Sequence, residues 1–247
     1  MDKTTVALLL AYDGGAFRGW QRQPGQASVQ QALERALEQH LGRRLAVFGA
    51  SRTDAGVHAE GQVAHFTARL PIDVPALAAA LPLPPSIRLR AAAVAKASFH
   101  ARSSAVAKRY RYRFSWGDGP RDAFFLGAGA SPRWDPAHAA LRGLDGLPQL
   151  SGLASPSRGR KPAPLLTSWS LEAGRDAATL EVRAPAFRKH QIRNLAGHLA
   201  AVALGLAAPE TLAALARMRR PWRGAMAPAH GLTLLEVLYP AELDPFR

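Results

Sequence analysis

The order of hydrophobic and polar positions predicts strands and helices along the whole chain. A continuous apolar run at residues 6–11 stops at Asp13-Gly14-Gly15, which is typical of a buried strand followed by a turn. Residues 28–41 carry an apolar stripe at helical spacing, and Ser28 with Gln31 three positions later is typical of a helix start. The remaining pattern predicts helices near 74–81, 189–206 and 209–218, and strands near 46–50, 63–67, 87–97, 166–172, 178–184 and 233–239.

Residues 108–116 show the clearest strand pattern, because two kinds of side chain alternate there. Cations at 109, 111 and 113 alternate with the aromatic residues Tyr110, Tyr112 and Phe114. A period of two gives a strand one aromatic face and one cationic face. The simplest interpretation places Tyr112 and Phe114 in the core of the protein.

Strands and helices mix without regular alternation, which favours an α+β fold over a doubly wound one. Each half of the chain can be interpreted as a β-α-β-β-α-β unit, so we expect an N-terminal half at residues 1–104 and a C-terminal half at 105–247. Residues 118–133 and 145–165 have the composition of loops. Within the second of these ranges, residues 155–162 are rich in Ser, Pro, Gly and Arg and predict a mobile basic segment.

The charges are strongly unbalanced, with 32 Lys and Arg against 18 Asp and Glu, a net charge of +14. Such an excess is usually tolerated for the sake of a polyanionic partner, most often RNA or DNA. Base composition of the genome is an alternative reason for the preference of Arg over Lys, though not for the net charge. The chain has no cysteine, which excludes disulfides, cysteine zinc sites and thiol catalysis. With no signal peptide and no membrane-spanning stretch, we expect a cytoplasmic protein.

The richest local signal is the polar, glycine-containing stretch 49–66, which carries Asp54 beside Arg52. Taken alone, an Asp two residues before Gly56 is most simply a turn former. The string Ser-Arg-Thr-Asp-Ala-Gly-Val-His-Ala at residues 51–59, however, resembles the active-site loop of the tRNA pseudouridine synthase A family. The one departure is Ser51, where the family pattern has glycine.

Further segments resemble the same family in the same order along the chain. They are Tyr12-Asp13-Gly14 with Gly19-Trp20-Gln21, Ser28-Val29-Gln30, Phe99-His100-Ala101-Arg102, Lys108-Arg109-Tyr110-Arg111-Tyr112, Phe187-Arg188-Lys189-His190-Gln191-Ile192-Arg193-Asn194 with Gly197, and Ala227-Pro228-Ala229-His230-Gly231. Residues 118–165 match poorly, and Gln191 stands where the family prefers methionine.

The resemblance implies a fold, a reaction and a substrate. The fold is the pseudouridine synthase fold, two ferredoxin-like α/β halves with largely antiparallel sheets that flank a basic active-site cleft. The reaction isomerises uridine to pseudouridine in the anticodon stem-loop of tRNA, at positions 38–40, through a covalent Asp intermediate. The protein would act as a homodimer and need no cofactor, because the isomerisation involves neither redox change nor group donor.

Three residues are expected to carry the chemistry. The resemblance assigns the nucleophile to Asp54, since an ionised carboxylate is a competent covalent nucleophile. A charged carboxylate in a pocket that excludes water needs a counter-charge, for which Arg193 is the candidate. Cations at the start of the helix predicted near 189 oppose the helix dipole, which makes sense if an anion faces that end. Tyr110 could stack on the flipped uracil or accept its C5 proton.

Arg52, Arg188, Lys189 and His190 are the remaining candidates, as RNA-binding residues. His58 and His65 fit no metal-ligand spacing, so no metal site is expected. Two alternatives stay open: a non-catalytic RNA-binding or RNA-folding protein, and another nucleic-acid enzyme such as a hydrolase. The second would need paired carboxylates or a His-based acid–base pair, and no recognisable cluster of either kind occurs in the sequence.

Overall fold

A computed structural model describes residues 3–69, 71–120, 122–127, 129–155, 164–218 and 224–247. The chain forms two compact units, Met1–Lys108 together with Thr233–Arg247, and Arg109–Leu232. Each unit combines strands with helices, and the strand pairs are mostly antiparallel, so the predicted α+β class is confirmed. Most of the basic segment predicted at 155–162 lies outside the described residues.

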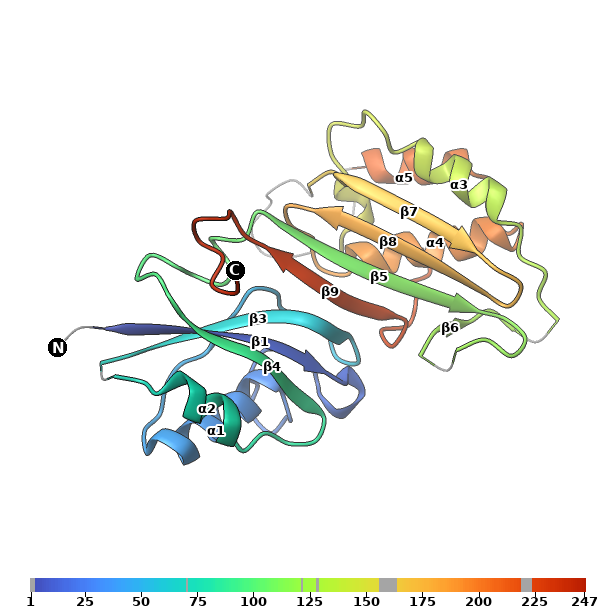
Figure 1. The fold of residues 1–247 in the computed structure, drawn as a ribbon. Helices are drawn as coiled ribbons and strands as arrows, with labels where there is room; N and C mark the ends of the chain where they lie inside the picture. The colour runs from blue at the N-terminus through green and yellow to red at the C-terminus, as the bar shows by residue number, and fades with distance from the viewer. Residues whose placement is uncertain (1–2, 70, 121, 128, 156–163, 219–223) are drawn as a thin grey trace. The chain divides into compact units, whose positions relative to one another are not determined.

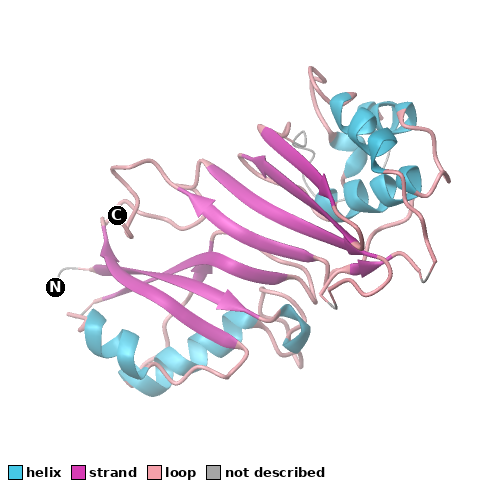
Figure 2. Ribbon diagram, turned by 45° about the vertical axis from the view of Figure 1, so that its right-hand side comes forward, coloured by secondary structure: helices cyan, strands magenta, loops and turns pink. Residues whose placement is uncertain are grey.

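The first unit is a small sheet with two helices on one side. Its strands follow the order β4-β1-β3-β9, in which β1 is antiparallel to β3 and β4, and β3 is parallel to β9. Figures 1 and 2 both show α1 and α2 on the same side of β1, β3 and β4. The elements are β1 (Thr4–Tyr12), η1 (Gly14–Ala16), α1 (Val29–Leu41), β2 (Phe48–Gly49), β3 (His58–Ala68), α2 (Val74–Ala80), β4 (Ile87–Ala95) and β9 (Leu232–Leu238).

Helix α1 shows why the sequence folds as it does in this unit. The Ser28 hydroxyl accepts a hydrogen bond from the Gln31 amide at 3.3 Å, which satisfies one of the free donors at the helix start. Gly42 ends the helix with φ 69°, a conformation that costs glycine little. The apolar stripe of the helix, with Leu33 and Leu37, is fully buried. The prediction of this helix is therefore confirmed.

The second unit has the same plan. Its strand order is β5-β8-β7, with β7 antiparallel to β8, and β6 pairs parallel to β5. The three helices gather on one side of these strands in both ribbon views (Figures 1 and 2). The elements are β5 (Ala107–Ser115), β6 (Phe124–Phe125), α3 (Trp134–Arg142), η2 (Ser151–Leu153), β7 (Ser168–Ala173), β8 (Ala177–Ala184), α4 (Gln191–Ala203) and α5 (Glu210–Arg217).

Strand β5 supplies much of the core of the second unit. Tyr112 and Phe114 are fully buried, as the alternating pattern predicts. The Phe114 ring lies 4.9 Å from the Trp134 ring of α3, centroid to centroid. The interpretation of Tyr112 and Phe114 as core residues is therefore confirmed.

Several predicted boundaries were wrong. Strand β3 begins at His58 rather than near residue 63, because its pairing with β1 continues to Ala59. Helix α4 begins at Gln191 and ends at Ala203, so it is shorter than the predicted 189–206. The ranges 118–133 and 145–165, predicted as loops, contain β6 and η2. Among the described residues, none of the helices is both long and apolar enough to span a membrane.

Candidate active site

Asp54 lies in the connection between β2 and β3, in a segment that we call the Asp54 loop (residues 50–57). The side chain is partly exposed, whereas Thr53 before it is buried. A tight turn follows the carboxylate, with the Val57 amide donating to the Asp54 carbonyl at 3.1 Å and Gly56 at φ 80°. Glycine adopts that φ without strain, which explains its place in the loop. The loop therefore presents one carboxylate on a closed turn.

A buried hydrogen-bond network holds the Asp54 loop against the sheet. The Tyr12 hydroxyl lies 2.8 Å from the Thr53 hydroxyl and accepts from Gln62 Nε2 at 3.3 Å. The same amide of Gln62 donates to the Ser51 carbonyl at 2.8 Å, and its Oε1 accepts from the Ser51 amide at 3.2 Å. Gln62 is fully buried and Tyr12 is 5% exposed. Because partly broken buried networks are costly, this one fixes the backbone on either side of Arg52.

The chemistry of Tyr12 suits such a support. Burial raises the pKa of Tyr12 to about 12, against the smaller lowering effect of its hydrogen bonds to Thr53 and Gln62. The phenol is therefore neutral at physiological pH and keeps its proton. Since Gln62 donates to the phenol oxygen, the phenol proton is available for the Thr53 hydroxyl.

The segment around Gly19 and Trp20 packs directly on the Asp54 loop. The Trp20 amide donates to the Thr53 carbonyl at 3.0 Å. A Cβ at Gly19 would stand 2.8 Å from that carbonyl oxygen and 3.1 Å from the carbonyl carbon of Asp54. Gly19 also has φ 95°, so glycine is required there for two reasons. Gly19 and Trp20, from the motif near the N-terminus, therefore pack against the backbone of the candidate nucleophile.

Ser51 fits the loop without strain. In the described part of the chain, His190 is the one non-glycine residue with positive φ, so Ser51 does not occupy a backbone conformation reserved for glycine. Both its amide and its carbonyl bond to Gln62. The departure from the family pattern at this position leaves the support of the loop intact.

Tyr110 lies on β5 in the second unit and is 5% exposed. Its ring meets the Phe187 ring edge to face, with centroids 5.2 Å apart and an interplanar angle of 84°. Such a contact orients the tyrosine ring as well as burying it. Phe187 directly precedes Arg188, so Tyr110 packs beside the start of the basic segment that leads into α4.

Arg193 is the third residue of α4 and is partly exposed. Its Nε donates to the Ala227 carbonyl at 2.9 Å, and the Ala227 amide donates to the Arg193 carbonyl at 3.0 Å. Next to this clamp, the Tyr112 hydroxyl donates to the Pro228 carbonyl at 2.8 Å. Burial raises the pKa of Tyr112, and the positive charge of Arg193 partly opposes the rise. The guanidinium therefore lies close to the aromatic face of β5.

The structure corrects the expected position of Arg188, Lys189 and His190. They precede α4 as a separate turn, which we call the basic turn (residues 188–190), instead of forming the first turn of the helix. His190 has φ 61°, a strained conformation for a non-glycine residue, and its Nδ1 lies 2.9 Å from the Ser155 hydroxyl. The Ser155 amide donates to the Lys189 carbonyl at 3.0 Å. Lys189 itself is exposed.

The predicted site residues divide between the two units. The first unit contains Asp54 and the exposed Arg52, whereas the second contains Tyr110, Arg193 and the basic turn. Sequence reasoning did not identify Gln62 as a supporting residue. A signal existed, because Gln62 is a polar residue that precedes the apolar residues of β3 and can only be buried with its amide bonded. Among the described residues, no three His, Asp or Glu side chains gather closely enough to hold a metal ion.

Comparison with known proteins identifies the family. A family profile described as tRNA pseudouridine synthase matches residues 156–240. The chain is similar to tRNA pseudouridine synthase A of Cupriavidus pinatubonensis, with 37% identity over 95% of this chain and 90% of the relative. The proteins of the same name from Aeromonas salmonicida and Solibacter usitatus are 38% and 36% identical, over 96% and 95% of this chain and 91% and 99% of the relatives.

A solved Cbf5–Nop10–Gar1 complex contains a chain that is similar over 92% of this chain and 57% of its own length, at 12% identity and a TM-score of 0.39. A likeness that weak does not bear on the assignment. The full-length relatives do, because each is more than 30% identical and matches nearly the whole of both chains. This chain therefore belongs to the tRNA pseudouridine synthase A family of isomerases.

Proposed function

We propose that this protein isomerises uridine to pseudouridine at positions 38–40 in the anticodon stem-loop of tRNA, through a covalent intermediate on Asp54. The observation that carries the proposal is the Asp54 loop: a partly exposed carboxylate on a closed turn, supported from behind by Tyr12, Gln62 and Gly19. A nucleophile must be held in a defined position to gain from proximity, and this support provides it. The relatives' common name, tRNA pseudouridine synthase A, supports tRNA as the substrate.

The reaction divides into steps that these side chains can perform. The Asp54 carboxylate forms a bond to the nucleotide, either at the ribose or at the base, and the C1′–N1 bond breaks. The uracil turns, C5 bonds to C1′, and N1 gains a proton while C5 loses its own. The bond between Asp54 and the nucleotide is broken again, C1′–C5 replaces C1′–N1, and one proton is lost from C5 while one is gained at N1, so the net change is an isomerisation without oxidant or donor.

In this proposal Tyr110 acts on the uracil, and Arg193 stabilises the negative charge of the Asp54 carboxylate. A ring already oriented by Phe187 can stack on a flipped base, and its phenol is a candidate acceptor for the C5 proton. The Arg193 Nε is held by the Ala227 carbonyl, which fixes the side chain, and a guanidinium favours the ionised form of a nearby carboxylate. Arg52, Arg188, Lys189 and His190 contact the RNA backbone in this proposal.

The partner and the setting follow from charge and family. A net charge of +14 suits an RNA recognised by its shape and backbone. We propose a homodimer in the cytoplasm, where the tRNA substrate is found. A non-catalytic RNA-binding protein is the alternative, and it would bind the same RNA without changing it.

The test is release of tritium from tRNA transcripts labelled at C5 of uridine, because the C5 proton leaves only when C5 bonds to the ribose. We expect release by the wild type and a fall of at least about 1,000-fold in the Asp54→Asn variant, which keeps the shape of the side chain but not its charge. Binding of the same transcript should be nearly unchanged in the variant. Tight binding by both proteins without release by either would favour the RNA-binding alternative.

The position in the tRNA needs a second measurement. Transcripts in which uridines 38–40 are replaced by cytidine should release no tritium, whereas replacement of uridines elsewhere should leave release from positions 38–40 unchanged. Continued release from the first set would contradict the assigned position while leaving the isomerase activity in place.

A further inference from the structure

Lys108 is a buried cation that the proposed reaction does not use. It is the second residue of β5 and is 8% exposed. In the described part of the chain, no carboxylate lies within ion-pair distance of its ammonium and no hydrogen bond to it is formed. A charged group taken out of water without a partner destabilises a fold, so an unpaired lysine at this depth calls for an explanation.

The neighbour of Lys108 makes the position more unusual. Burial, and next the positive charge of Arg102, lower the pKa of Lys108 to about 8. The effect of Arg102 on this pKa indicates a second cation in the surroundings of Lys108. Among the described residues, no carboxylate within ion-pair distance of Lys108 offsets these charges. A structural lysine would be expected beside a carboxylate, as Arg109 is beside Glu181 at 3.3 Å.

The turn that carries Arg102 is fixed by hydrogen bonds. The His100 amide donates to the Ser104 hydroxyl at 3.0 Å, and the Ser104 amide donates to the His100 carbonyl at 2.9 Å. The Arg102 amide donates to His100 Nδ1 at 3.1 Å. Tyr239 ties the same turn down by donating its hydroxyl proton to the Ala101 carbonyl at 2.7 Å. These bonds fix the backbone that carries Arg102, a few residues before Lys108 in the chain.

We propose that Lys108 and Arg102 together bind one backbone phosphate of the RNA substrate. This inference rests on the proposed function only in taking RNA as the ligand. A phosphate has the charge that the two cations lack as a partner, and its oxygens can accept from both side chains. Since Lys108 is already mostly buried before the RNA arrives, little further desolvation opposes the contact. A cation stabilised by the ligand rather than by the protein also explains why β5 tolerates it.

The experiment compares Lys108→Met and Lys108→Arg with Lys96→Met, in which an exposed lysine is removed. The probe is an unmodified tRNA transcript, and its affinity is measured from about 50 to 300 mM KCl. Loss of one phosphate contact should reduce the slope of log affinity against log salt by about 0.7–0.9. We expect that change for Lys108→Met, a smaller one for Lys96→Met, and a slope close to the wild type for Lys108→Arg.

Two further readouts separate binding from a structural role. Lys108→Met removes a buried charge, so its melting temperature should equal or exceed that of the wild type, whereas a structural lysine would leave the variant less stable. With a pKa near 8, Lys108 is about nine-tenths charged at pH 7 and about one-quarter charged at pH 8.5. Wild-type affinity should therefore fall about threefold to fourfold over that range, and Lys108→Arg, which stays charged, should not follow it.

The proposal is overturned if Lys108→Met binds the transcript with the affinity and salt slope of the wild type. It is also overturned if affinity is lost together with melting temperature at an unchanged slope, or if the wild type and Lys108→Arg weaken equally at pH 8.5. None of these measurements depends on turnover. A wild type that releases no tritium would end the proposed isomerase activity and leave the binding comparison intact.

Discussion

The Asp54 loop in the first unit and the basic turn in the second are held in opposite ways. Around Asp54, neutral and mostly buried groups bond the loop from both sides, through Gln62 and Tyr12. The basic turn instead contains partly or fully exposed cationic side chains, and its backbone is strained at His190. One segment is built to keep its position, and the other displays charge.

The difference indicates what each segment needs for its proposed task. A group that forms a bond must stand within a fraction of an ångström of its target, which requires a locked supporting layer. Cations that bind a phosphate backbone act over longer distances and tolerate several geometries. Changes behind Asp54 should therefore reduce turnover, whereas changes in the basic turn should reduce affinity.

Among changes in the support of the Asp54 loop and in the basic turn, Gly19→Ala should have the largest effect. The new Cβ would press on the Thr53 carbonyl and the Asp54 backbone, which cannot move without breaking the hydrogen bonds of the loop. We expect turnover to fall by at least about 100-fold, since a displacement of about 1 Å can cost that much. Unfolding free energy should fall by about 2–4 kcal/mol, from backbone strain and overpacking together. Tritium release and urea unfolding measure the two effects.

Gly25→Ala is the matched control for that variant. Gly25 has φ 70°, so an alanine there is strained in the same sense, but its Cβ would meet no atom within 4 Å. It should lose about 1 kcal/mol of stability and keep wild-type turnover. If Gly19→Ala also kept its turnover, the loop would not be the rigid support described above.

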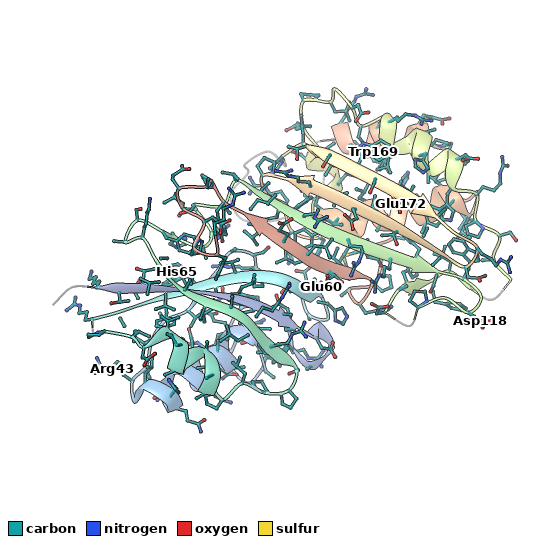
Figure 3. The ribbon with its side chains drawn as sticks, in the orientation of Figure 1. Arg43, Glu60, His65, Asp118, Trp169 and Glu172 are labelled. Carbon is teal, nitrogen blue, oxygen red and sulfur yellow. The ribbon has the colours of Figure 1, made fainter. Side chains whose placement is uncertain are left out.

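His65 provides a second way to test the support of the first unit, through pH. It comes from β3 (Figure 3), and its Nδ1 accepts from the Ala101 amide at 3.2 Å. Its ring stacks on Phe48 of β2, just before the Asp54 loop, with centroids 5.3 Å apart. Burial, and next the charge of His100, lower the pKa of His65 to about 4. A protonated His65 could not accept from Ala101, so the fold requires the neutral ring.

The direction of the pH effect follows from linkage. In the unfolded chain His65 takes up a proton near its ordinary pKa of about 6.5, whereas in the folded chain it resists protonation down to about pH 4. Above about pH 7 the ring is unprotonated in both states, so His65 does not make the free energy of unfolding depend on pH. That free energy falls as the pH drops from about 6.5 to about 4. At pH 5 the loss should be about 2 kcal/mol.

Urea unfolding between pH 7.5 and pH 5 should show this loss in the wild type and much less of it in His65→Gln, which keeps a donor and an acceptor without a titrating group. His40→Gln, on α1, removes a histidine from the helix end and serves as the control. An equal pH dependence in wild type and His65→Gln would assign the acid sensitivity to other groups.

The sequence predicts those parts of the fold that rest on local patterns. The alternation along β5 and the capping of α1 are both found, because each depends only on residues that are close together in the sequence. The Asp54 loop was recognised from its string of residues. Its support was not, because Tyr12 and Gln62 stand 50 positions apart and meet only after β1 pairs with β3. Long-range contacts of this kind leave no local pattern.

Helix α3 was not among the predicted helices, for a related reason. It contains Pro136 in its first turn and follows a stretch with Gly129 and Pro132, so local signals there resemble a loop. Tertiary contacts decide the matter, since Trp134 stacks on Trp116 with centroids 5.8 Å apart. The positive φ of His190 could not be predicted either, because the preference of histidine for that conformation is too weak to identify a single position.

Lys189→Gln should have the smallest effect on stability and turnover. It is nevertheless the most informative test of the difference between the Asp54 loop and the basic turn. The side chain is exposed, so the unfolding free energy should stay within about 0.5 kcal/mol of the wild type. If Lys189 contacts a phosphate, affinity for an unmodified tRNA transcript should fall a few-fold, and the salt slope should fall by about 0.7–0.9. Turnover at saturating tRNA should not change.

Arg43→Gln is the control, because Arg43 is an exposed cation just after α1 in the first unit (Figure 3). It should leave both slope and turnover unchanged. A fall in saturated turnover for Lys189→Gln, with the control unaffected, would show that the basic turn positions the reacting groups as well as the RNA. The division between a locked loop that reacts and a charged turn that binds would then be wrong, since both segments would contribute to the geometry of the transition state.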